Sequence, residues 1–73
     1  MGKTVSITVK FGERVREMRL AAGLSQESLA EKCGLDRTYI SGIERGKRNL
    51  SLKNIEALAI ALDVSISNLA TGL

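Results

Sequence analysis

The chain has 73 residues, a length that allows one small domain and excludes two. It contains no histidine and one cysteine, so it cannot assemble a usual zinc site, a Ser-His-Asp triad, a Cys-His nucleophile or an internal disulfide. We therefore expect no metal, no cofactor and no enzymatic activity. A core of this size supplies only about 3–5 kcal/mol of stability, which makes dimerisation worth expecting.

The formal net charge of +3 is distributed unevenly along the chain. Residues 37–53 carry a single acidic side chain and five basic ones, namely Arg37, Arg45, Lys47, Arg48 and Lys53. A surface that faces a polyanion needs such a cluster, although a solvated basic face is the commoner cause of a basic run. The charge pattern alone therefore favours nucleic acid only weakly.

The sequence favours a soluble, cytoplasmic protein. No apolar run approaches the roughly 18–20 residues of a membrane span, and the N-terminus lacks the apolar core of a secretory signal. The lone Cys33 fits a reducing compartment, and its place in an apolar helical pattern predicts a packed side chain rather than a reactive thiol. The first residues, from Met1-Gly2 to Ser6, match the permissive N-myristoylation pattern, for which chance is the better explanation.

The chain begins with a segment of ambiguous pattern. Residues 4–9 alternate with period two and are rich in β-branched side chains, as in a strand, but the chain offers this strand no partner. We interpret residues 1–9 as an N-terminal arm that is flexible or paired in a dimer. A first helix over residues 10–22, ended by Gly23, is predicted by apolar side chains at helical spacing: Phe11, Val15, Met18 and Ala22.

Four further helices are predicted, and each begins with a side chain that can cap it. The second covers residues 25–33 and stops at Gly34, and the third covers residues 36–45 and stops at Gly46. Ser51 and Ser65 begin the fourth and fifth helices. The prediction is an all-α, compact five-helix domain over residues 10–73.

The second and third predicted helices are separated only by Gly34-Leu35. Glycine permits the left-handed turn that lets the third helix cross the second steeply, and the small Ala30 leaves room for the crossing. This spacing is typical of a helix-turn-helix. From spacing alone, a DNA-binding unit and an ordinary packed helix pair are about equally expected.

Four short segments carry a resemblance to a known family: Gly23-Leu24-Ser25-Gln26, Leu29-Ala30, Gly34 and Tyr39-Ile40-Ser41-Gly42-Ile43-Glu44-Arg45-Gly46. Together they resemble the Cro and phage-repressor helix-turn-helix family, and are most similar to the controller proteins of restriction-modification systems. The resemblance implies a lambda-repressor-like domain that binds a palindromic operator as a homodimer and both activates and represses its own operon. A phage-type repressor or a DNA-binding antitoxin would share the same residues.

The resemblance places the base-reading residues at the start of the third helix. Arg37 can present its planar fork to guanine O6 and N7 in the major groove. Thr38 can touch a thymine methyl or a base edge. Tyr39 either packs at the helix joint or directs its hydroxyl to a base or a phosphate.

Phosphate contacts are expected around these residues. Gln26 falls at the family's phosphate-contact position, where the helix N-terminus adds backbone N–H donors. Further contacts are expected on or just after the third helix from Ser41, Arg45, Lys47, Arg48 and Asn49. Gly42 costs roughly 1 kcal/mol in a helix relative to alanine, and close approach to DNA is one reason for its small size.

The remaining expectations concern the scaffold. The resemblance suggests that Glu44 pairs with Arg19 on the first helix, whereas an exposed surface pair would contribute only about 0–1 kcal/mol. Gly34 and Gly46 are expected to be structural, as helix stops.

The expected partners are double-stranded DNA, a second copy of the chain and RNA polymerase. The chain has more apolar side chains near its C-terminus than its own small core needs. They predict a dimer interface formed by Val64, Ile66, Leu69 and Leu73. Glu27 and Glu31 could offer an acidic surface to RNA polymerase, although solvated helix charges are the commoner outcome.

A helical module that binds protein rather than DNA is the competing interpretation from a different class. Affinity for DNA falls steeply with salt because counterions are released, whereas an apolar protein groove is much less sensitive to salt. Salt dependence therefore distinguishes the two.

Overall fold

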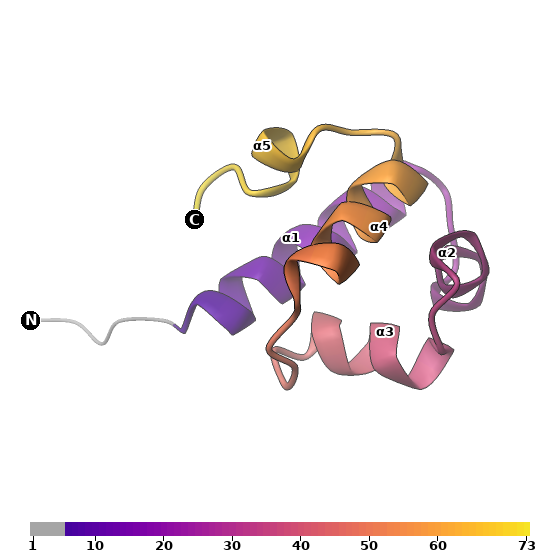
Figure 1. Cartoon of the computed structure of the whole chain (residues 1–73), viewed down its shortest axis with the longest axis horizontal. Coiled ribbons are helices and arrows are strands. Elements are labelled where there is room, and N and C mark those ends of the chain that lie inside the picture. The colour runs from indigo at the N-terminus through magenta and orange to yellow at the C-terminus, as the bar shows by residue number, and fades with distance from the viewer. Residues whose placement is uncertain (1–5) are drawn as a thin grey trace, which may run out of the picture.

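The computed structural model describes residues 6–73, which form five helices and no strand. The helices are α1 (Ile7–Ala21), α2 (Gln26–Cys33), α3 (Arg37–Glu44), α4 (Leu52–Leu62) and α5 (Ile66–Leu69). Helix α3 packs against α1, α2 contacts both α3 and α4, and the short α5 packs against both α1 and α4 (Figure 1). The predicted all-α, five-helix class is confirmed. None of the described helices is long and apolar enough to cross a membrane.

Helices α2 to α5 begin directly after the capping residues predicted from the sequence. The side chains of four residues each accept a hydrogen bond from a backbone N–H two or three residues later: Ser25, Asp36, Ser51 and Ser65. Gly34 and Gly46 end α2 and α3 with φ angles of 71° and 74°, a left-handed conformation that glycine adopts without a steric penalty. The local signals therefore determine where α2 to α5 start.

The first helix starts three residues earlier than predicted. Ser6 caps it by accepting a hydrogen bond from the Thr8 backbone N–H at 3.3 Å, and residues 7–9 are helical. The prediction that these three residues belong to an arm is therefore wrong: the serine cap and packing of Val9 against Gly46 outweigh the strand-like alternation. Residues 1–5, with the rest of the predicted arm and the Met1-Gly2 pattern, lie outside the described residues.

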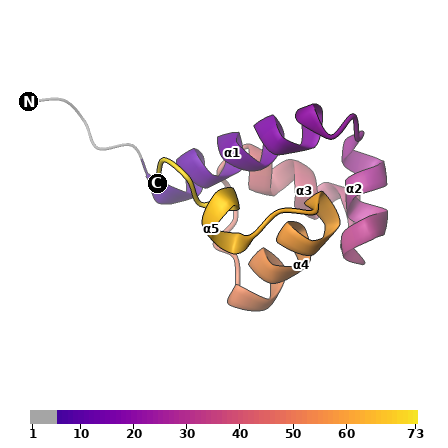
Figure 2. The same ribbon diagram turned by 90° about the horizontal axis from the view of Figure 1, so that it is seen from above.

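The core lies among the five helices, whose arrangement Figure 2 shows from above, and it is built from aliphatic side chains of all five helices and one aromatic ring. Its members are Phe11, Val15, Leu29, Ala30, Ile40, Ile43, Leu58, Ala59, Leu62 and Leu69.

Two predictions about which side chains face the core need correction. Ala22, expected to face inward, follows the last helical residue and is exposed. Leu69, expected at a dimer interface, is fully buried in the core of its own chain and cannot contact a partner.

Helices α1 and α3 approach each other closely at Gly12. A Cβ atom placed on Gly12 would lie 2.2 Å from the Ile43 carbonyl oxygen and 3.0 Å from that of Glu44. Any side chain at this position would collide with the backbone of α3. The requirement for glycine at position 12 depends on the distance between two helices. It has no local sequence signal and was therefore not predicted.

Candidate nucleic-acid interface

Helices α2 and α3 form the predicted helix-turn-helix. The left-handed Gly34 ends α2, and the Leu35 N–H donates back to the Ala30 carbonyl at 2.9 Å, which closes the turn. Arg37 and Thr38 follow in the first turn of α3, and both are exposed. The geometry therefore presents the start of α3 to solvent.

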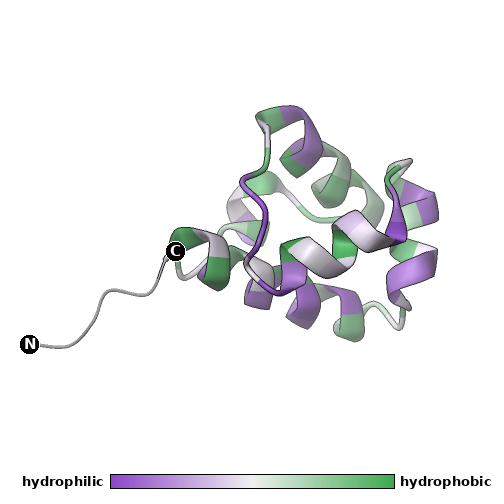
Figure 3. Cartoon of the chain, turned by 90° about the horizontal axis from the view of Figure 1, so that it is seen from below, coloured by the Kyte–Doolittle hydropathy of each residue, from purple (hydrophilic) through white to green (hydrophobic). Residues whose placement is uncertain are grey.

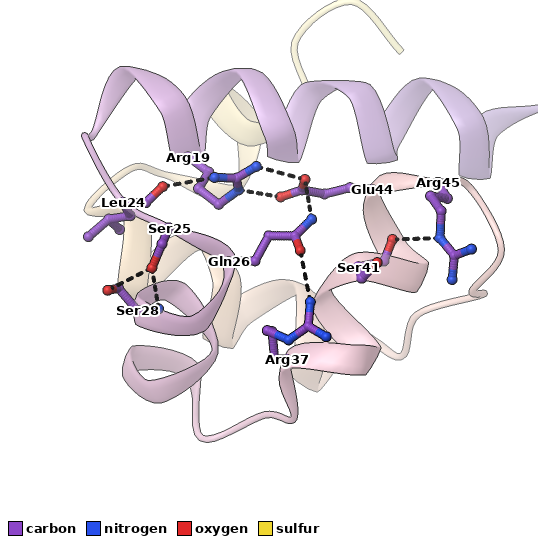
Figure 4. A network of polar contacts seen from close by, with 9 residues as sticks. All are labelled: Arg19, Leu24, Ser25, Gln26, Ser28, Arg37, Ser41, Glu44 and Arg45. Carbon is purple, nitrogen blue, oxygen red and sulfur yellow. Dashed lines mark hydrogen bonds and ion pairs between the residues drawn. The ribbon is translucent and has the colours of Figure 1, made fainter.

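A buried ion pair fixes the other end of α3 to α1 (Figure 4). Arg19 Nε donates to Glu44 Oε2 at 2.6 Å and Arg19 Nη2 to Glu44 Oε1 at 3.0 Å, so the pair is bidentate. The two side chains are 9% and 4% exposed. The hydrogen bond to Glu44 raises the pKa of Arg19, against the opposing effect of burial. The structure thus contains the pair that the family resemblance suggested, and it is shielded from water.

Gln26 links this ion pair to Arg37. Its Nε2 donates to Glu44 Oε1 at 3.1 Å, and its Oε1 accepts from Arg37 Nη1 at 3.4 Å (Figure 4). The side chain expected to hold a phosphate therefore lies between two protein groups. Its carbonyl oxygen faces the guanidinium expected to read a base.

Tyr39 lies at the joint between α3 and α4. The ring is half-buried against the core, its hydroxyl accepts a hydrogen bond from Asn54 Nδ2 at 3.1 Å, and the Arg48 guanidinium lies 5.2 Å from the ring centroid. The ring thus packs at the helix joint, one of the two expected roles. The contact of Asn54 with Tyr39 was not predicted from the sequence.

Gly42 lies under the side chain of Arg48. A Cβ atom on Gly42 would lie 3.1 Å from Arg48 Nε and 3.2 Å from Arg48 Cγ. The side chain that crosses Gly42 is therefore Arg48, and this contact within the chain is a second reason for a small residue beside the expected approach to DNA.

The residues expected to contact phosphates gather beside α3. Arg45, Lys47, Arg48 and Asn49 are exposed in the segment that joins α3 to α4, and Ser41 is half-buried with its carbonyl accepting a 3.4 Å hydrogen bond from Arg45 Nε. Figure 3 views this face and shows a hydrophilic connection running from α3 to α4. The basic segment thus follows the end of α3 opposite its exposed start, and Arg48 reaches back along the helix to the Tyr39 ring.

An apolar groove adjoins the end of this basic segment, since Asn49 is one of its lining residues. Ile66 and Leu73, both predicted at a dimer interface, line it together with Ile7, Phe11, Leu50 and Leu52. Val64, also predicted there, is half-buried against the core and does not line the groove. Ile7 and Leu52, which are 65% and 80% exposed, line the groove without having been predicted there from the sequence.

The described residues hold no candidate metal centre, since none of their His, Cys, Asp or Glu side chains form a group of three or more. Cys33 is half-buried against the core, as expected, and burial raises the pKa of its thiol.

Comparison with known proteins places the chain in a family. A model of the helix-turn-helix family matches residues 15–69. The chain is 52% identical over 67 residues to the control protein C.BamHI of Bacillus amyloliquefaciens, an alignment that covers 90% of this chain and 83% of that protein. This chain belongs to the helix-turn-helix family and, within it, to the restriction-modification controller proteins.

Solved structures of other controller proteins share the fold. The structure of C.AhdI from Aeromonas hydrophila has a TM-score of 0.83 and 60% sequence identity, and the match covers 85% of this chain and 94% of that one. C.Esp1396I, a controller protein solved as a tetramer in complex with its natural 35-base-pair operator, has a TM-score of 0.78 and 45% identity, with 85% and 82% of the two chains covered. The helix arrangement described above is therefore the arrangement of this family.

Proposed function

We propose that the chain is a sequence-specific transcriptional regulator that binds a palindromic operator as a homodimer and both activates and represses its own restriction-modification operon. One observation carries the proposal: Arg37 and Thr38 are exposed in the first turn of α3, while the buried Arg19–Glu44 pair holds the other end of the same helix. A rigidly held helix with an exposed N-terminal turn fits the major groove of DNA. A regulator of this kind works in the cytoplasm.

The base-reading role rests on the chemistry of α3. Arg37 supplies a planar fork for guanine O6 and N7, and Thr38 supplies a hydroxyl and a methyl for a neighbouring base. Basic side chains after α3 supply contacts to the flanking phosphates, which set the register without reading sequence. In the free protein Gln26 accepts a hydrogen bond from Arg37, so the guanidinium is held near the groove-facing end of α3 before DNA binds.

The homodimer rests on the apolar groove. Ile7, Leu52, Ile66 and Leu73 are between 42% and 80% exposed around it, more apolar surface than a monomer of this size needs. A second copy placed symmetrically would bury these side chains. A dimer that binds a palindrome must place its two α3 helices about 34 Å apart, one turn of DNA. The similarity to C.Esp1396I, solved with its operator, supports the same partner for this chain.

Selection from a pool of randomised duplex DNA tests the proposal. The wild type is expected to enrich a palindrome, and its affinity for that sequence should fall with salt by a slope of about −0.9 for each phosphate contacted. A pool in which no sequence is enriched, with no binding at low salt, would contradict the proposal and favour the protein-interaction module.

Activation requires a contact with RNA polymerase, which we assign to the exposed Glu27 and Glu31 on α2. Charge reversal at both positions is expected to abolish activation in a purified transcription assay while leaving operator affinity within about twofold. Charge reversal of Glu13, an exposed residue of α1, is the control. Normal activation by the doubly reversed variant would contradict this assignment.

A further inference from the structure

We propose that Asn54, on α4 and outside the helix-turn-helix, sets the Tyr39 hydroxyl as a hydrogen-bond donor toward the operator. Asn54 is a positioning residue in this account, since it acts through Tyr39. The inference rests on the proposed function, because it assigns a direction to one of the hydrogen bonds that the regulator makes with DNA.

The Tyr39 side chain is held from two sides. The Arg48 guanidinium lies 5.2 Å from the ring centroid, in the space that Gly42 leaves free, and Asn54 Nδ2 donates to the hydroxyl oxygen at 3.1 Å. Asn54 is itself fixed, because its backbone N–H donates to the Ser51 cap of α4 at 3.2 Å. The ring and its hydroxyl therefore have a defined position before DNA arrives.

The direction of the Asn54 hydrogen bond decides what Tyr39 can offer. A phenol hydroxyl has one hydrogen to donate and an oxygen that accepts. Because the amide of Asn54 occupies the accepting oxygen, the O–H hydrogen is left to donate elsewhere. In the major groove it can meet purine N7, guanine O6 or thymine O4, and on the backbone a phosphate oxygen, but not the amino groups of adenine or cytosine.

The residue type at position 54 supports this role. Position 54 is the third residue of α4, where the helix dipole stabilises a carboxylate but not an amide, while asparagine and aspartate have similar helix propensities. An aspartate would therefore suit the helix better. It would also accept the Tyr39 hydrogen and leave only the phenol oxygen facing outward, as an acceptor.

A double-mutant cycle tests the inference, using the full chain and a duplex carrying the operator selected by the wild type. Asn54→Ala is expected to weaken binding about three- to tenfold, the range of one neutral hydrogen bond. In a Tyr39→Phe background the same substitution should change affinity by less than twofold, because the hydroxyl it positions is gone. Asn54→Asp should move the preference at the affected base pair toward bases that present an amino group.

The controls separate charge and folding from positioning. Ser51→Asp adds the same charge at the start of the same helix and keeps a capping side chain, so it should leave base preference unchanged. Thermal unfolding of each variant reports whether the fold is intact.

Two positive outcomes identify the acceptor. A sequence-dependent loss with Asn54→Ala indicates a base, and a loss equal for all sequences indicates a phosphate. Two results would overturn this inference while leaving the proposed function intact, provided that the wild type binds its operator. In the first, the Asn54 variants bind as tightly as the wild type and with the same base preference. In the second, Asn54→Ala weakens binding equally in the Tyr39→Phe background. Failure of the wild type to bind would count against both.

Discussion

The Arg19 guanidinium on α1 and the Glu44 carboxylate on α3 form a two-point ion pair that is almost completely removed from water. Glu44 also accepts from Gln26, which in turn accepts from Arg37, so the pair is the buried end of a chain of polar contacts that reaches the exposed start of α3. Removing one member of a buried pair leaves the other charge without a partner, which costs more than losing an exposed pair.

Arg19→Ala is expected to lower the free energy of unfolding by about 3–5 kcal/mol, since it leaves the Glu44 carboxylate buried and uncompensated. Urea unfolding measures the loss. Arg16→Ala, at an exposed position of the same helix, is the control and should change stability by less than about 0.5 kcal/mol. Full stability of the Arg19→Ala variant would show that the pair does not hold α3 in place.

Gly12→Ala is expected to destabilise the fold by about 3 kcal/mol. In an open helix this change would be favourable by about 1 kcal/mol, but here the new Cβ would lie 2.2 Å from the Ile43 carbonyl oxygen and would force α1 and α3 apart. Thermal unfolding shows directly whether the substitution raises or lowers the stability of the fold. An increase in melting temperature would mean that the two helices are farther apart than described.

Leu52→Lys is expected to weaken dimerisation at least tenfold, because Leu52 is 80% exposed at the rim of the apolar groove. Ile60→Lys is the matched control, since Ile60 is 72% exposed on the same helix but does not line the groove. Sedimentation equilibrium measures both dissociation constants. Equal weakening by the two substitutions would place the dimer interface elsewhere.

The Cys33 thiol is expected to react slowly with an aromatic disulfide reagent. Burial raises the pKa of this thiol, so the thiolate fraction at neutral pH is smaller in the folded chain than in the unfolded one. At pH 7–8 the thiol should react more slowly in the folded chain than in the unfolded chain. The part of this rate difference that comes from the raised pKa should shrink as the pH rises above that pKa. The same chain in denaturant is the reference, and equal rates at pH 7 would contradict a packed Cys33.

Features encoded by neighbouring residues were predictable from the sequence. Serine and aspartate caps gave the starts of α2 to α5, and Gly34 gave the turn within the helix-turn-helix, because each acts through hydrogen bonds or φ angles within a few residues. The same local reasoning was wrong over residues 7–9, where alternating β-branched residues read as a strand. There the Ser6 cap and tertiary packing determine the conformation.

Features that depend on distances between helices were not predictable. Leu69 has the apolar character of an interface residue, and only the position of α5 against α1 and α4 shows that it belongs to the core. Arg14 gives no sequence signal of its contact with Asn68, whose carbonyl oxygen accepts from Arg14 Nη2 at 2.8 Å and ties α1 to α5. Asn54 reaches Tyr39 across 15 residues of sequence in the same way.

The most direct test of the account is the affinity of the wild type and of Arg37→Ala for the selected operator and for duplexes altered at one base pair of each half-site. We expect the wild type to lose about 1–3 kcal/mol of binding free energy when the guanine read by Arg37 is replaced, and the variant to bind both duplexes equally. If Arg37→Ala keeps the full preference for that guanine, the first turn of α3 does not read the operator and the central claim is wrong.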